Sequence, residues 1–64
     1  MMRFKEGQRI WRREDAREGV VIVADETGFS VCMKRADGTD GRLALACDPA
    51  DFMDATEFVA TEGE

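Results

Sequence analysis

Several chemically reactive residue types are absent from this chain or rare in it. The 64 residues include no histidine, and Cys32 and Cys47 are the only thiols. A serine or cysteine nucleophile needs a general base beside it, and histidine is the usual one. Without histidine and without a Cys-x-x-C pair, the chain also lacks an ordinary zinc ligand set. The sequence therefore predicts a protein that is not an enzyme and that needs no metal or cofactor.

Long hydrophobic segments are missing as well. The longest strongly apolar run covers residues 20–24, whereas a membrane-spanning helix needs roughly 20 apolar residues. No signal-peptide core follows the charged N-terminal residues. Secreted domains of this size usually depend on several disulfides, so two cysteines favour reduced thiols. We therefore expect a cytoplasmic protein that does not enter a membrane.

The length leaves room for one domain, residues 1–64. A domain this small buries only about 60% of the surface that its unfolded chain exposes. A deep catalytic cleft would remove volume from a core that is already small. We therefore expect the function to be carried on the outer surface.

The glycine pattern indicates a β-meander. Glycines stand at positions 7, 19, 28, 38 and 41, and short runs rich in β-branched residues lie between several of them. We expect strands at residues 8–13, 19–25, 29–35 and 42–47. The second has four β-branched residues in a row, which predicts a central strand with both faces largely covered. Two Asp-Gly pairs between the third and fourth strands predict a tight hairpin there.

Alternation along these strands predicts which side chains form the core, because successive residues of a strand point to opposite faces. The residues expected to point inward are Ile10, Phe29, Val31, Met33, Leu43, Leu45 and Cys47. Cys32 then falls on the outer face and Cys47 on the inner one. A disulfide between them would be geometrically awkward.

The C-terminal quarter leaves two alternatives open. Asp48 followed by Pro49 has the composition of a helix start, with Asp48 as N-cap. A short helix could run on to Phe58, or a single helical turn could give way to a last strand over residues 56–60. We favour the turn and strand, and we expect residues 61–64 to be frayed.

Four strands, a helical turn and a short fifth strand resemble the small SH3-like barrels, including their KOW and Tudor branches. The resemblance is carried by residues 4–10, by Glu18-Gly19-Val20-Val21 and by the third strand with Ala36-Asp37-Gly38 after it. It implies a mainly β fold: a small five-stranded SH3-like barrel with one short helical turn before the last strand. It transfers no ligand, because KOW domains that bind nucleic acid are generally basic, whereas this chain has a net charge of −5.

A Tudor-like aromatic cage has few candidates in this chain. With no tyrosine present, they are Trp11, Phe29 and Phe52, and Phe29 is already expected in the core. We expect Trp11 to cap the end of a thin barrel. An exposed role in binding a ligand is the alternative for this side chain.

Charge is distributed unevenly along the chain. Residues 1–43 contain nine basic and eight acidic side chains, whereas residues 44–64 contain six acidic ones and no basic one. The first functional hypothesis is a protein-binding module whose acidic face docks on a basic, nucleic-acid-binding surface of a partner, with carboxylates in place of phosphates. Small acidic anti-CRISPR inhibitors of phages are similar in size, charge and expected fold. The expected partner-binding residues are Asp48, Asp51, Asp54, Glu57, Asp25, Glu26, Asp37 and Asp40.

The alternative is KOW-like binding of nucleic acid or of a ribonucleoprotein through basic residues. Arginine holds phosphate with two parallel hydrogen bonds, although interleaved acids weaken the field in this half of the chain. A solvated surface with ordinary ion pairs would explain either set of charges without a partner. We expect a monomer, or a weak homodimer formed by pairing of an edge strand. The residues of the alternative site are Arg9, Arg12, Arg13, Arg17, Lys34, Arg35 and Arg42.

Overall fold

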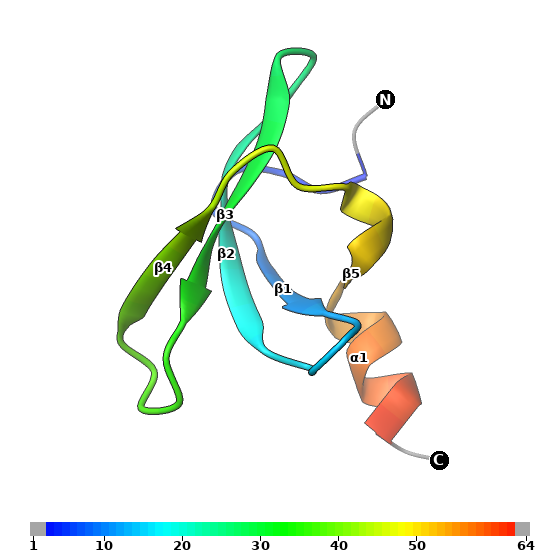
Figure 1. Ribbon diagram of the computed structural model, residues 1–64. Helices are drawn as coiled ribbons and strands as arrows, with labels where there is room; N and C mark the ends of the chain where they lie inside the picture. Colours follow the sequence, from blue (N-terminus) through cyan, green and yellow to red (C-terminus); the bar gives the residue numbers. More distant parts are fainter. Residues whose placement is uncertain (1–2, 63–64) are drawn as a thin grey trace.

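The chain folds around one antiparallel sheet of five strands, seen in a computed structural model that describes residues 3–62 (Figure 1). In chain order the strands are β1 (Arg9–Arg12), β2 (Glu18–Asp25), β3 (Gly28–Lys34), β4 (Asp40–Ala44) and β5 (Phe52–Met53). A 3₁₀ turn, η1 (Pro49–Asp51), precedes β5, and an α-helix, α1 (Ala55–Glu62), follows it. The prediction of a mainly β protein with five strands is confirmed, although the fifth strand is not at the predicted residues 56–60.

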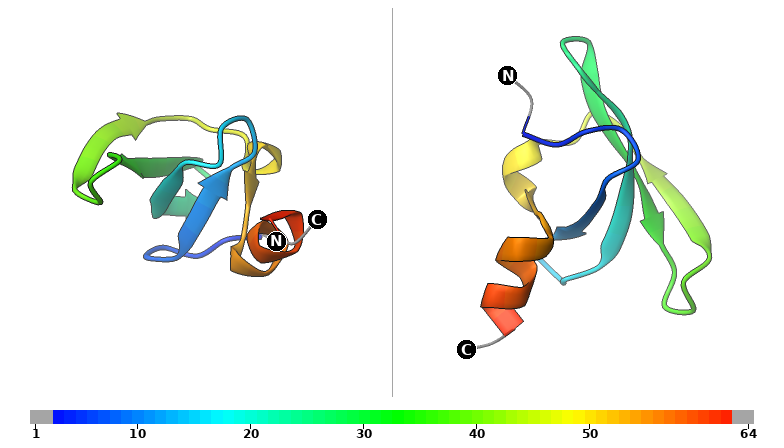
Figure 2. Two further views of the ribbon diagram at one scale, coloured as in Figure 1. Left: turned by 90° about the horizontal axis from the view of Figure 1, so that it is seen from below. Right: turned by 180° about the vertical axis from the view of Figure 1, so that it is seen from behind.

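The sheet is open. Its strand order is β4-β3-β2-β1-β5, so β2 is central, as predicted. Both views of Figure 2 show β4 at one side of the molecule and β5 with α1 at the other. Closure into the expected barrel would require β4 to pair with β5, and β5 is only two residues long. None of the helices in residues 3–62 is long and apolar enough to cross a membrane.

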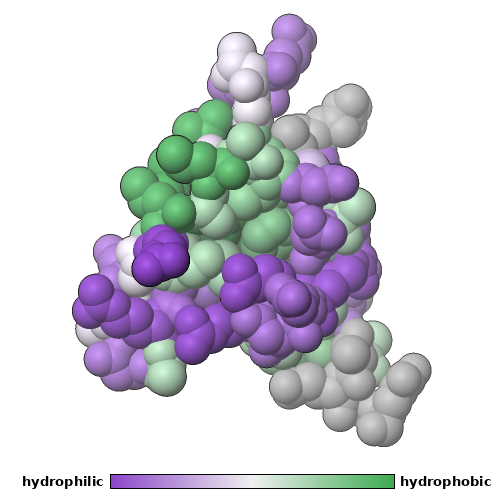
Figure 3. Space-filling view, in the orientation of Figure 1, coloured by the Kyte–Doolittle hydropathy of each residue, from purple (hydrophilic) through white to green (hydrophobic). Residues whose placement is uncertain are grey.

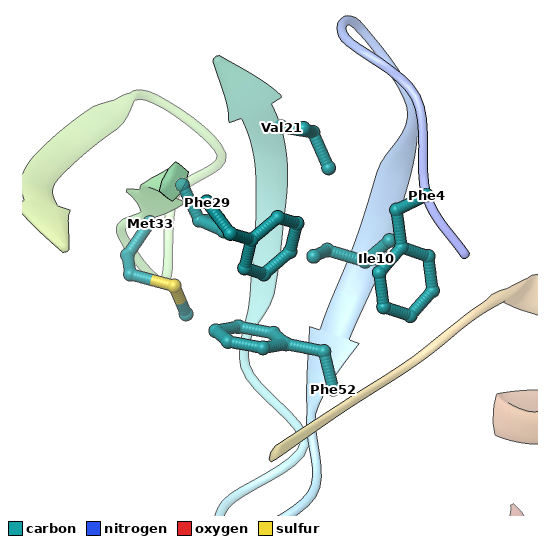
Figure 4. Close-up of a cluster of buried hydrophobic side chains, with 7 residues drawn as sticks. Phe4, Ile10, Val21, Phe29, Met33 and Phe52 are labelled. Carbon is teal, nitrogen blue, oxygen red and sulfur yellow. The ribbon is translucent and has the colours of Figure 1, made fainter. Parts of the chain in front are cut away.

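One face of the sheet carries the core, which Figure 4 shows in close-up. Three phenylalanines occupy its centre: the Phe29 ring centroid lies 5.7 Å from that of Phe4 and 5.6 Å from that of Phe52. Phe4 belongs to the segment before β1 and is 1% exposed, so this segment covers the sheet. The inward positions predicted for Ile10, Phe29, Val31 and Met33 are confirmed.

The prediction of inward positions was wrong for two residues near β4. Leu43 is 54% exposed and Leu45 is 71% exposed. The register between β3 and β4 shifts between Cys32 and Lys34. This irregularity places Ala44 on the core face, opposite Val31, so that Leu43 points outward beside Cys32. Between the pairs that Cys32 and Lys34 form, β4 has one residue more than β3. Alternation counted from the hairpin does not include this additional residue, so it assigns Leu43 to the wrong face.

The two thiols lie as predicted, and both are free. Cys47 packs against the core as expected, because the left-handed backbone at Ala46 (φ 53°) redirects the chain. Cys32 lies on the outer face in β3, opposite Val20 of β2. Burial raises the pKa of the Cys47 thiol, which keeps it protonated at neutral pH.

The outer face of the sheet is only partly covered. Helix α1 packs on its β1 and β5 end, where the rings of Trp11 and Phe58 stack with centroids 4.5 Å apart and an interplanar angle of 8°. Trp11 is therefore buried, at 8% exposure, beneath a helix rather than at the end of a barrel. On the β2 side no such cover exists among the described residues, and Ile22 is 41% exposed. The expectation that both faces of β2 are largely covered was wrong at Ile22, whereas Val20 is half-buried.

The last strand predicted at residues 56–60 was also wrong, because this segment is helical. The Asp54 carboxylate accepts a hydrogen bond from the Glu57 backbone N–H at 2.8 Å, which makes Asp54 the N-cap of α1. The spacing Asp54-x-x-Glu57 is a capping-box signal. The predicted helical turn at η1 is confirmed, with the Asp48 carboxylate accepting from the Ala50 N–H. Of the segment expected to fray, residues 61 and 62 belong to α1, and residues 63 and 64 lie outside the described residues.

Candidate functional site

The structure distributes the eight predicted acidic site residues over three regions. Two lie at the β2–β3 turn and two at the β3–β4 hairpin, and Figure 1 shows these turns at opposite ends of the molecule. The remaining four follow the chain through η1 into α1. No single acidic face unites the three groups.

Four of these carboxylates stabilise the local chain. Asp25 accepts a hydrogen bond from the Thr27 N–H at 2.8 Å, and Asp37 accepts one from the Thr39 N–H at 3.0 Å. The hydrogen bonds from the hydroxyls of these two threonines, together with the backbone ones, lower the pKa of both carboxyls. The third and fourth, Asp48 and Asp54, are the caps described above. Turn and helix formation is thus sufficient reason for these acids to stand where they do.

Two further carboxylates are held by bases of the same chain. Asp40 pairs with Lys34 at 2.6 Å across the β3–β4 hairpin. Glu57 pairs with Arg13 at 2.7 Å and also contacts Arg3, so it joins α1 to the segments on both sides of β1.

Only two of the eight are left without such a role. The carboxylates of Glu26 and Asp51 make no hydrogen bond or salt bridge to any part of residues 3–62. These two lie on different regions of the surface, at the β2–β3 turn and in η1.

Four of the seven predicted basic residues are likewise engaged in ion pairs: Lys34 with Asp40, as described above, and three arginines. Arg9 and Glu18 form two parallel hydrogen bonds of 3.0 Å, and Arg12 and Asp15 form two of 3.0 and 2.6 Å. The Arg12 guanidinium lowers the pKa of Asp15 to about 2. Arg13 reaches the backbone carbonyl oxygen of Ala50 at 3.0 Å in addition to Glu57.

A groove between the turn after β1 and the β3–β4 hairpin gathers most of the remaining positive charge. We call it the basic groove, and its volume is about 740 Å³. Five of the seven basic residues predicted for the alternative site line it, whereas Arg9 and Arg13 do not. The lining residues are Arg12, Arg17, Met33, Lys34, Arg35, Gly41, Arg42, Leu43 and Ala44.

Three arginines of the basic groove are free to bind an anion. Arg17, Arg35 and Arg42 are exposed, and within residues 3–62 none of their side chains forms a salt bridge. Arg12 and Lys34 also line the groove but are paired with Asp15 and Asp40. A guanidinium group presents parallel N–H donors that match the oxygens of a phosphate or carboxylate. The groove can therefore hold an anion by two-point hydrogen bonds from more than one direction.

Apolar residues also line the basic groove, whose shape depends on a close approach of two strands. Met33, which is 6% exposed, Leu43 and Ala44 are among the lining residues. A Cβ atom at Gly41 would lie 2.8 Å from the Met33 carbonyl oxygen, so only glycine lets β4 approach β3 here. Sequence reasoning missed Gly41 and Met33 as site residues, since the irregular register that brings them together has no local signal.

A smaller hollow continues from the basic groove toward β1. It has a volume of about 390 Å³ and shares Arg17, Lys34 and Arg35 with the groove. Trp11 and Glu18 also line it. The positive surface therefore extends along the molecule instead of ending at one pocket.

No protein-family model, curated protein or solved structure matches this chain.

Proposed function

We propose that this protein is a non-catalytic binding module that holds nucleic acid, as a phosphate-bearing polyanion, in the basic groove. One observation carries the proposal: three arginines without a salt bridge among the described residues converge on one groove that two further bases line. Uncompensated bases gathered in a groove are the usual electrostatic footprint of phosphate binding. The apolar residues that line it, Met33, Leu43 and Ala44, offer a surface for a base or sugar beside the phosphates.

The net charge of −5 sets the expected character of this binding. At a distance the protein repels a polyanion, so attraction acts at short range, within the groove. Each phosphate of a single strand that is neutralised contributes roughly −0.7 to the slope of log K against log salt. Three available arginines therefore predict a slope of about −2, which is small for a nucleic-acid-binding protein.

The experiment is a titration of the protein into a fluorescein-labelled single-stranded oligonucleotide, with anisotropy read at low and moderate salt. Arg42→Gln tests the groove, and Lys5→Gln is the matched control, because it removes the same charge from an exposed position outside the groove. A charge-assisted hydrogen bond contributes roughly 1.5–3 kcal/mol, so Arg42→Gln should weaken binding about tenfold or more. Equal effects of the two variants, or no binding at low salt, would refute the proposal.

Docking of the acidic C-terminal segment on a basic partner is the second candidate. It is supported by the six acids without a base in residues 44–64 and by the exposed carboxylate of Asp51, which forms no salt bridge within residues 3–62. In this case the protein would inhibit a nucleic-acid-binding partner by occlusion, as the anti-CRISPR resemblance implies. The geometry supports it less, because most of the carboxylates it requires already hold the fold together.

A double charge reversal, Asp51→Lys with Glu26→Lys, tests this candidate without removing a described cap or ion pair. The tagged protein and the variant are used to capture partners from lysate, with and without nuclease. Loss of a nuclease-resistant basic partner on reversal would support docking. Equal capture by both proteins would exclude it.

The resemblance to SH3-like barrels stays a prediction. The chain has the five strands that the resemblance implies, but the sheet is not closed into a barrel.

A further inference from the structure

The two edge strands of the sheet, β4 and β5, differ in length and in how much of each is covered by the rest of the chain. At one edge, β5 has two residues and leads directly into α1, which packs over the outer face there. At the other edge, β4 has five residues and pairs with β3 on one side only. In the part of the chain that the structure describes, nothing covers the other side of β4. Its backbone is therefore a template for pairing with one more strand.

The end of β4 and the residues that follow it lack the features that usually prevent such pairing. Proteins protect edge strands with charges, prolines and bulges. The first half of β4 has such protection, with Asp40, Arg42 and the irregular register. Residues 43–47 contain no charge and no proline, and the two leucines among them are the most exposed hydrophobic residues near the edge. Figure 3 shows one continuous hydrophobic area over this part of the molecule, with hydrophilic residues below it.

The outer face adds an apolar row that ends at the same edge. Val20, Cys32 and Leu43 lie side by side across β2, β3 and β4. A further strand beside β4 would continue this row and would reduce the exposure of Leu43. Contacts of this kind between side chains on neighbouring strands stabilise a sheet.

We propose that β4 pairs with β4 of a second copy of this chain, antiparallel about a two-fold axis at Ala44. The segment Leu43-Ala44-Leu45 reads the same in both directions. Antiparallel pairing about Ala44 sets Leu43 of each copy opposite Leu45 of the other, on one face of the joined sheet. The small side chain at the axis lets the two strands approach. The pattern is thus complementary to its own reverse, which favours a second copy over an unrelated strand.

The charge distribution is compatible with this contact. The acid-rich residues 48–62 lie with η1 and α1 on the side away from β4 (Figure 2). The contact itself is uncharged, and the net charge of −5 on each copy opposes association only at longer range. The left-handed backbone at Ala46 ends the extended segment soon after Leu45, so the ladder is short and the dimer is weak.

A further consequence rests on the proposed function. The basic groove is lined by residues 41–44, so pairing along β4 brings two grooves close to the same axis. A polyanion that spans both grooves binds the dimer more tightly than the monomer. By linkage, it then strengthens the dimer by the same factor.

Sedimentation velocity over micromolar to millimolar protein tests the dimer directly. We expect a concentration-dependent monomer–dimer equilibrium that strengthens with salt, since salt screens the repulsion between the copies. Leu45→Lys should weaken the dimer at least about tenfold. Val59→Lys should not, because Val59 is equally exposed, at 68% against 71% for Leu45, but lies on α1. Circular dichroism verifies that both variants fold.

The outcomes separate this proposal from the proposed function. A monomer at every concentration and salt, or a dimer lost in Val59→Lys but not in Leu45→Lys, would overturn the pairing along β4. The same runs with a single-stranded oligonucleotide read the coupling. A dimer that forms alone while the oligonucleotide fails to bind would leave the dimer standing and reject the basic groove as a nucleic-acid site.

Discussion

Replacing Phe58 with alanine removes the ring that stacks on Trp11, and with it the main apolar contact that holds α1 on the sheet. A fully buried Phe→Ala change costs about 3–5 kcal/mol of unfolding free energy. Phe58 is only half-buried, which reduces this to about 2–2.5 kcal/mol, lost stacking included. Alanine returns about 0.5 kcal/mol through its higher helix propensity. The net loss is about 2 kcal/mol, equivalent to a fall in Tm of about 10 °C for a domain of this size.

Two measurements assess this prediction. Thermal unfolding followed by circular dichroism gives the change in Tm, and the emission maximum of Trp11, the only tryptophan, reports its exposure. The emission should move to longer wavelength as the indole, now 8% exposed, becomes hydrated. Val59→Ala is the control, since it changes helix propensity in the same direction at a position that is 68% exposed. If Phe58→Ala melts at the same temperature as Val59→Ala with unshifted emission, α1 does not pack on Trp11 as described.

Two further predictions concern the sheet and the acid limit of stability. A Cβ atom at Gly19 would lie 2.6 Å from Cγ1 of Val31, which is fully buried, so Gly19→Ala should cost about 1–3 kcal/mol in denaturant unfolding. Gly28→Ala, where nothing lies within 4 Å, is its control, and equal midpoints would contradict the close contact. The pKa of Asp15 is about 2 in the folded protein, chiefly because of its hydrogen bonds to Arg12, and four other carboxyls are lowered in the same direction. Those four are Glu18, Asp25, Asp37 and Asp40. The unfolded chain therefore binds more protons than the folded one between about pH 4 and 2, so Tm should fall across this window on acidification. With no histidine, Tm should stay nearly constant between about pH 8 and 5, and a Tm at pH 2.5 equal to that at pH 7 would refute the assignment.

Local signals in the sequence were sufficient for most of the sheet. The strands β1 to β3 and the inward positions of Ile10, Phe29, Val31 and Met33 follow from alternation between turn residues. These features depend on neighbours in the chain, because a strand's two faces are set by its own period of two. The same holds for η1, where Asp48 and Pro49 define the start of the turn.

The site could be predicted only as a set of candidate residues. The sequence predicted all five basic residues of the groove as part of a binding site. It also included Arg9 and Arg13 in that site, and it favoured the acidic site over the basic one. Which charges remain available depends on which pairs form in space, such as Arg9 with Glu18 and Arg13 with Glu57. These pairs join separate elements, so no local pattern reveals them.

Only the tertiary structure decided the rest. The sequence left open a helix that runs on to Phe58 or a strand over residues 56–60, and an isolated helix of eight residues such as α1 is marginal in water. The stack of Phe58 on Trp11, 47 positions earlier in the chain, favours the helix. In the same way, the register between β3 and β4 placed Leu43 outside and Ala44 inside. Composition by itself determined a small, acidic, β-rich domain, whereas long-range pairing determined its open edge and its basic groove, because both arise where distant segments meet.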